Sequence, residues 1–205
     1  MEMQLLNEED KKVNLLAERI TEYFICNGIT TEEMREENIY GLEVLMGKIV
    51  NYTTLIVLSF WKHNTIPMIC FMIVFFSLRG RTGGFHASTR INSYFGTIIM
   101  FFLITEIFVP LIKLSLISLI ATLIFSDNII FLLAPVNHPN LSLSNEEIKD
   151  CKNVSRWLAI LFTSIAIVLY EIGIIPECIS YMVIGIGADA GLLIVAKIKK
   201  QEGTE

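Results

Sequence analysis

The chain is organised around residues 79–93, which read RGRTGGFHASTRINS. This short stretch is polar, cationic and rich in glycine, and a long apolar run lies on each side of it. Polar backbone that breaks a membrane pattern is tolerated where protein buries it or water reaches it, and such places permit chemistry. We therefore interpret residues 79–93 as the working site of the protein.

Glycines predict the local path of this stretch. Gly80, Gly83 and Gly84 can take positive φ values, so we expect a bend there, with helix only after His86. Ser93 follows His86 by seven residues, a spacing that places it about 10 Å further along a straight helix. Joint action of the two side chains therefore requires the chain to fold back, or His86 to precede the helix. The alternative is a cytoplasmic loop that carries a solvated histidine.

Composition indicates an integral membrane protein. Of the 205 residues 53% are hydrophobic, and the mean hydropathy is +0.59, values that do not suit a soluble domain. The histidines are scattered and the four cysteines show neither a C-x-x-C pattern nor metal-ligand spacing. We therefore expect no metal, no cofactor and no nucleic-acid partner.

Apolar runs predict an all-α fold with six membrane spans. We place these spans at residues 41–61, 64–78, 94–109, 111–134, 156–173 and 178–196. Pro110 and Lys113 mark the expected break between the third span and the fourth. Residues 1–40 should form cytoplasmic amphipathic helices, with a capping box at Thr30 and Glu33. The six-span domain then covers residues 41–196, and residues 197–205 form a cytoplasmic tail.

Basic residues predict the orientation in the membrane. They gather in residues 79–90, 149–156 and 197–200. Six spans place these three clusters on one side of the bilayer, and the positive-inside rule makes that side cytoplasmic. Both termini and the working site are therefore expected at the cytoplasmic boundary.

Polar residues inside the spans need partners. Four acidic residues fall there: Glu106, Asp127, Glu171 and Asp189. Because hydrocarbon excludes charge, each must face the bundle interior, water or a partner. The G-x-x-x-G spacing from Gly187 to Gly191 favours close helix packing, and it also suits a homodimer.

The order of residues in the working site resembles the active-site segment of the AgrB family (accessory gene regulator protein B). The resemblance rests on Arg79, Gly83-Gly84, His86-Ala87 and the position of Ser93, and it extends to residues 40–43 and 134–136. Members of the family are membrane-embedded cysteine endopeptidases that process the precursor of a cyclic autoinducing peptide in Gram-positive quorum sensing. The resemblance implies that His86 is the catalytic base and that Arg79 and Gly84 support the site.

Ser93 departs from the family pattern, because the family carries cysteine at this position. A thiol has a pKa of about 8.5 and is readily ionised by an adjacent imidazole, whereas a serine hydroxyl must lose its proton during attack. Ser93 should therefore be much weaker or inactive. We interpret the chain as a Cys-to-Ser variant that binds without cleaving, with a natural serine enzyme and a pseudoenzyme as the alternatives.

The resemblance also implies a reaction and a partner. In the family, the thiolate cleaves the precursor to give a thioester acyl-enzyme, and a cysteine of the peptide then closes a thiolactone ring. The expected partners are therefore an AgrD-like precursor peptide and the lipid bilayer. Arg79 is expected to hold a substrate carbonyl or carboxylate, Arg81 and Arg90 to attract an acidic tail, and Gly83 and Gly84 to face the oxyanion. A non-catalytic peptide binder and a small peptide exporter remain as other classes.

Overall fold

The computed structural model of the chain describes residues 2–83, 90–113, 116–136 and 144–199. These residues are overwhelmingly helical, and six of the helices are long and apolar enough to cross a membrane. The predicted all-α fold with six spans is therefore confirmed. The chain divides into two compact units, Met1–Val57 with Ala87–Ile98 and Leu58–His86 with Ile99–Glu205.

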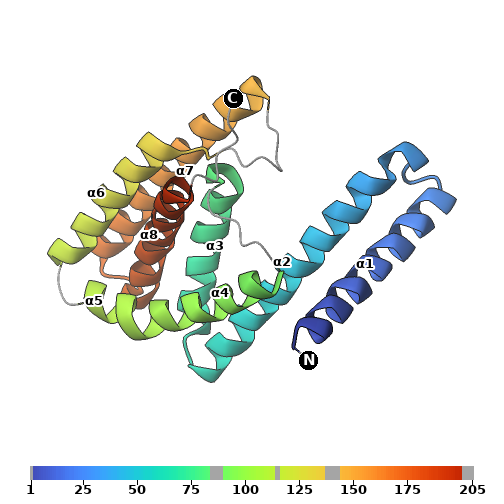
Figure 1. Cartoon of the computed structure of the whole chain (residues 1–205). Coiled ribbons are helices and arrows are strands. Elements are labelled where there is room, and N and C mark those ends of the chain that lie inside the picture. The colour runs from blue at the N-terminus through green and yellow to red at the C-terminus, as the bar shows by residue number, and fades with distance from the viewer. Residues whose placement is uncertain (1, 84–89, 114–115, 137–143, 200–205) are drawn as a thin grey trace. The chain divides into compact units, whose positions relative to one another are not determined.

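The first unit contains a pair of antiparallel helices (Figure 1). Helix α1 (Glu2–Cys26) is followed by a short 3-10 helix, η1 (Glu32–Met34), and then by the long helix α2 (Arg35–Trp61). Asn14 of α1 donates a side-chain hydrogen bond to Glu43 of α2 over 2.9 Å. This polar contact ties the two helices together near their middle.

The capping box predicted at Thr30 and Glu33 is wrong. Thr31, not Thr30, precedes the 3-10 helix, and its side chain makes no capping hydrogen bond. The hydroxyl of Thr30 instead accepts a hydrogen bond from Asn38 over 2.8 Å. A side-chain donor one turn into α2 therefore uses the oxygen that the box required.

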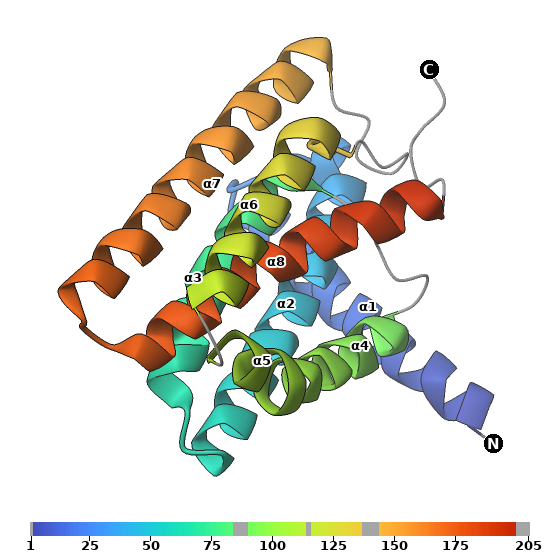
Figure 2. The same cartoon turned by 90° about the vertical axis from the view of Figure 1, so that its left-hand side faces the viewer.

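The second unit is built around helix α8 (Pro176–Ile198). This helix packs against α3 (Thr65–Thr82), α6 (Leu116–Leu133) and α7 (Asn145–Ile172), as Figure 2 shows. In the apolar window of α8 67% of the residues are buried, against 33% or less in each other span. The last span is therefore the centre of this unit, and its neighbours shield it from lipid.

Glycines let the neighbouring helices approach α8 closely. A Cβ atom on Gly185 would lie 3.2 Å from the Val74 side chain and 3.3 Å from the Phe71 carbonyl oxygen, both on α3. A Cβ on Gly187 would lie 3.5 Å from the Ser126 hydroxyl on α6. Gly187, which begins the G-x-x-x-G pattern, thus serves the close packing that we expected, and it does so within the chain.

The third span ends later than the sequence predicted. Helix α4 (Arg90–Leu103) continues through a π-helical turn, η2 (Ile104–Phe108), into α5 (Val109–Lys113). Pro110 therefore does not end the span, and the fourth span begins at Leu116 rather than at residue 111. Proline lacks the N–H donor and crowds the preceding turn, and a wider π-helical turn directly before it accommodates both effects.

Each of three acidic residues within the spans has a partner in the chain or is exposed. Glu106 accepts a hydrogen bond from the ammonium group of Lys62 over 2.6 Å. Asp127 of α6 accepts one from the hydroxyl of Thr163 on α7 over 2.9 Å. Glu171 is exposed near the end of α7. These positions satisfy the expectation that buried carboxylates need a partner or an exit to water.

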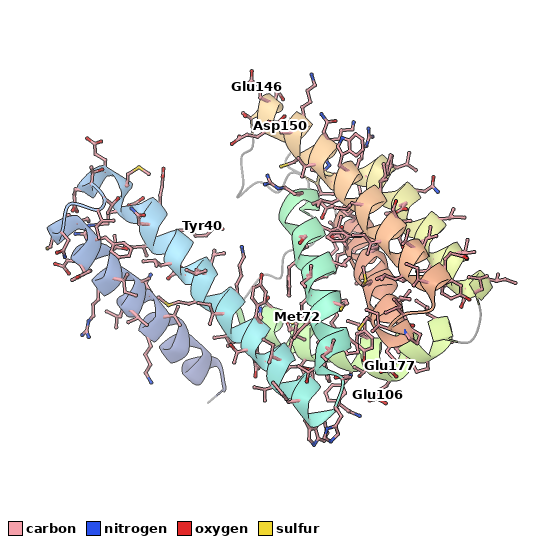
Figure 3. The ribbon with its side chains drawn as sticks, turned by 180° about the vertical axis from the view of Figure 1, so that it is seen from behind. Tyr40, Met72, Glu106, Glu146, Asp150 and Glu177 are labelled. Carbon is pink, nitrogen blue, oxygen red and sulfur yellow. The ribbon has the colours of Figure 1, made fainter. Side chains whose placement is uncertain are left out.

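Polar groups mark the two ends of the second unit. Figure 3 shows Glu146 and Asp150 at one end of it and Glu106 and Glu177 at the other. The first end begins with a capping box, in which Ser144 and Glu147 exchange side-chain-to-backbone hydrogen bonds. The apolar lengths of the helices run between these ends, as a bilayer requires.

Candidate functional site

Helix α3 ends at the glycine pair of the predicted site. Thr82 is its last residue, and Gly83 takes a φ of 66°, which confirms the bend predicted for this glycine. The bend predicted at Gly80 is wrong, because Gly80 lies inside α3. Gly84 and His86 fall outside the described residues. The described part of helix α4 starts at Arg90.

A distant segment holds the bend in place. The N–H of Val136 donates a hydrogen bond to the Thr82 carbonyl over 2.9 Å, and Gly83 and Val136 form an isolated parallel β-bridge. A Cβ atom on Gly83 would lie 2.3 Å from the Val136 carbonyl oxygen, so only glycine fits this position. The structure thus brings residues 134–136 against the start of residues 79–93. These are two of the stretches on which the resemblance rests.

Arg79 reaches the same bend from one turn earlier in α3. Its Nη1 atom donates a hydrogen bond to the carbonyl oxygen of Gly83. The last carbonyls of a helix have no intrahelical donor, and a cation near them is favoured by the helix dipole. Arg79 therefore closes the end of α3 and fixes the direction of the Gly83 carbonyl. Arg81, in the same turn, is exposed.

Asp189 lies behind this turn on the central helix. The residue is 0% exposed, and its Oδ1 atom accepts a hydrogen bond from the Thr82 hydroxyl over 2.9 Å. A carboxylate charge at this position would also attract the Arg79 guanidinium. The Oδ2 atom is buried and has no hydrogen-bond partner among the residues that the structure describes. Asp189 thus links α8 to the end of α3.

Thr82 is a residue of this site that the sequence analysis missed. Asp189 carried a signal, because a carboxylate in an apolar span needs a reason to be there. Thr82 carried none, since a threonine in a polar stretch is ordinary. The two residues are separated by 107 positions, so no spacing rule within one helix could pair them.

Ser93 lies in the first turn of α4, in the other unit. Its side chain is exposed, and its carbonyl accepts a hydrogen bond from the Thr97 hydroxyl over 3.0 Å. The first turn of a helix has N–H groups without intrahelical acceptors and carries the positive end of the dipole. An anionic nucleophile at position 93 would be stabilised there. Arg90 opens the same turn.

The described residues give no sign of a metal centre. Among them, no three His, Cys, Asp or Glu side chains converge as metal ligands would. This part of the chain offers an exposed hydroxyl near a helix start and a polar bend held by a backbone hydrogen bond and by Arg79.

The fold and the site define a multi-pass membrane protein whose polar, glycine-ended bend separates the second span from the third. The family profile of AgrB, accessory gene regulator B, matches residues 17–194. The chain therefore belongs to the AgrB family. Members of this family are membrane cysteine proteases that take part in the processing of agr quorum-sensing peptides. The match confirms the resemblance seen in the sequence. No significant match was found among curated proteins or among solved structures.

Proposed function

We propose that this chain is an AgrB-type membrane endopeptidase that receives an AgrD-like precursor peptide, with position 93 as the nucleophile position and His86 as the base. One observation carries the proposal. The bend at Gly83, which belongs to the family pattern, is held by the Val136 N–H on the Thr82 carbonyl and by Arg79 on the Gly83 carbonyl. A solvated connecting loop has no need of such contacts.

The reaction follows the order that the family implies. His86 takes the proton from the nucleophile at position 93 as it attacks the peptide carbonyl, and it gives a proton to the leaving amine. The acyl group then stays on position 93 until a cysteine thiolate of the bound peptide attacks it. That attack breaks the acyl-enzyme bond and closes the thiolactone ring. Gly83 and Gly84 are the proposed donors to the oxyanion.

Ser93 makes the present chain a binder rather than an efficient enzyme. A cysteine thiolate in the first turn of α4 would gain from the helix dipole, but a serine hydroxyl is not ionised beforehand and needs a more closely placed base. We propose that the chain still holds the precursor, with Arg79 on a carbonyl or carboxylate. Arg81 and Arg90 attract the acidic tail of the peptide. Precursor therefore stays bound and uncleaved.

The bound peptide arrives from the cytoplasm. The basic clusters favour a cytoplasmic position for residues 79–93, for both termini and for the tail at 197–205. Residues 1–40 lie on that face, and residues 41–196 form the membrane domain. The cell is Gram-positive, as the family implies.

A homodimer would use a surface other than the part of α8 that is buried within the chain.

A peptide exporter is the weaker alternative. It would depend on carboxylates that move protons or substrate through the spans, and Glu106, Asp127 and Asp189 each accept a hydrogen bond from a side chain of this chain. Such contacts suit a packing or positioning role. A non-catalytic peptide binder is the stronger alternative, because Ser93 removes the family nucleophile.

Cleavage of an AgrD-like precursor in liposomes tests the proposal. We expect the present chain to bind the peptide without cleaving it. Ser93→Cys should cleave it and accumulate a thioester that hydroxylamine releases. Ser93→Cys combined with His86→Ala should bind and fail to cleave.

Ser164→Cys is the matched control, because it adds a thiol on an exposed position of α7 and leaves position 93 unchanged. This variant should not cleave. If Ser93→Cys binds the peptide and does not cleave it, the chain is a binder. If it neither binds nor cleaves, the AgrD-like partner is wrong.

A further inference from the structure

Asp189 stands where the central helix meets the start of the reactive stretch. We propose that Asp189 is a positioning residue of the reaction, which holds Thr82 and Arg79 so that the Gly83 bend keeps one direction. The inference rests on the proposed function, because it assigns a role in that reaction. Asp189 itself touches neither position 93 nor a substrate in this role. It acts through the end of α3.

The first link runs through Thr82. Its hydroxyl donates to Asp189 over 2.9 Å, while its carbonyl accepts the Val136 N–H over 2.9 Å. One buried residue thus joins three segments, which are α3, α8 and the stretch after α6. Loss of the Asp189 acceptor would free the last turn of α3 from the central helix. The backbone contact with Val136 and the contact of Arg79 with Gly83 would then have to hold the bend without it.

The second link is electrostatic and runs through Arg79. The guanidinium donates to the Gly83 carbonyl, and a carboxylate charge at Asp189 would attract it. This attraction would add to the hydrogen bond from Thr82 to Asp189 in holding the end of α3.

The burial of Asp189 supports a role beyond packing. A leucine would fill the same space in the middle of an apolar unit at no cost in desolvation, whereas a carboxylate is expensive there. Asp189 is 0% exposed, and its Oδ2 atom is without a hydrogen-bond partner in the described part of the chain. Such a residue persists where its contacts serve a site.

Asp127 supplies a matched control. It is also a carboxylate within a span, and it also accepts a hydrogen bond from a threonine hydroxyl over 2.9 Å. Its partner, Thr163, belongs to α7, and the contact joins α6 to α7 without Gly83 or Arg79. Removal of either carboxylate costs a similar helix-to-helix hydrogen bond. Only removal of Asp189 should disturb the bend.

The first experiment measures cleavage in the Ser93→Cys background. We expect Asp189→Ala to lower kcat by about tenfold or more, the size of one lost hydrogen bond to a charged group. KM should change less than kcat does, because Arg81 and Arg90, which are proposed to attract the acidic tail, are unchanged. Asp189→Asn keeps an acceptor for Thr82 and should recover part of kcat. Asp127→Ala should leave kcat within about twofold of the background.

The second experiment is independent of activity and uses the present chain in nanodiscs. Amide hydrogen exchange is followed in the peptide that contains Val136, whose N–H bonds to Thr82. Asp189→Ala and Thr82→Val should each speed this exchange by about tenfold, and Thr82→Ser should restore it, because serine keeps the hydroxyl. Asp127→Ala should leave it unchanged. Melting in detergent confirms that each variant is folded.

The outcomes separate the two proposals. If Ser93→Cys does not cleave, the proposed function fails, while the exchange at Val136 still tests the link through Asp189. The positioning role is overturned if Asp189→Ala leaves the exchange at Val136 unchanged. It is also overturned if Asp127→Ala lowers kcat and speeds the exchange as much as Asp189→Ala does, since the effect is then one of general stability.

Discussion

Replacement of Gly83 by alanine should be the most damaging small change in the described part of the site. Gly83 combines a φ of 66° with a ψ of −132°, a backbone conformation that side chains rarely adopt. Its added Cβ would lie 2.3 Å from the Val136 carbonyl oxygen, which is a backbone atom that no rotamer change can move away. The bend and the segment at Val136 must therefore separate.

The magnitude follows from these two effects. Backbone strain of this kind costs roughly 1–3 kcal/mol. Separation of the segments also removes the hydrogen bond from the Val136 N–H to the Thr82 carbonyl, which contributes roughly 1 kcal/mol. We therefore expect Gly83→Ala to lower the free energy of unfolding by about 2–4 kcal/mol.

The assay is reversible unfolding in mixed micelles of dodecyl maltoside and SDS, followed by far-ultraviolet circular dichroism. Gly80→Ala is the matched control, because Gly80 lies in the same helix, and a Cβ there meets nothing within 4 Å. It should be neutral or stabilising by up to about 1 kcal/mol. If the two substitutions change the free energy of unfolding equally, the contact between Gly83 and Val136 does not hold the bend.

Three further predictions concern the spans. Gly185→Ala should lower the free energy of unfolding by about 1–3 kcal/mol, because its Cβ would crowd α3 at 3.2 Å, and the same unfolding assay measures this. Ser144→Ala should cost about 1 kcal/mol by removing the capping box with Glu147, and exchange of the first amides of α7 should become faster. A double-mutant cycle on Lys62 and Glu106 should give a coupling of about 0.2–1 kcal/mol that falls with added salt, because both side chains are partly exposed. A coupling unaffected by salt would contradict the contact.

Hydropathy predicted the spans well because length and apolar content are properties of contiguous sequence. The local predictions failed where a neighbouring residue or turn changed the preference of the predicted residue. Pro110 looked like a break, yet the π-helical turn before it lets the helix continue to Lys113. Thr30 matched a capping box, yet Asn38 takes its hydroxyl oxygen. The π-helical turn thus removed the steric conflict at Pro110, and the Asn38 side chain bound the oxygen that the capping box at Thr30 required.

The candidate site was predictable in part. The bend at Gly83 followed from the position of glycine at the end of an apolar run, and the family match confirms the resemblance from which the site was identified. The same rule failed at Gly80, where the helix simply continues. Glycine permits a positive φ without requiring one, so the choice among neighbouring glycines depends on what packs against them.

The sequence by itself determined that the chain is a six-span, all-α membrane protein of the AgrB family with a polar bend after the second span. Those properties depend on composition, length and local residue order. Only the tertiary structure decided that α8 is the central helix, that Val136 holds the Gly83 bend and that Asp189 meets Thr82. Such contacts join residues far apart in the chain, because the rotation and depth of each helix are set by the surfaces that it packs against.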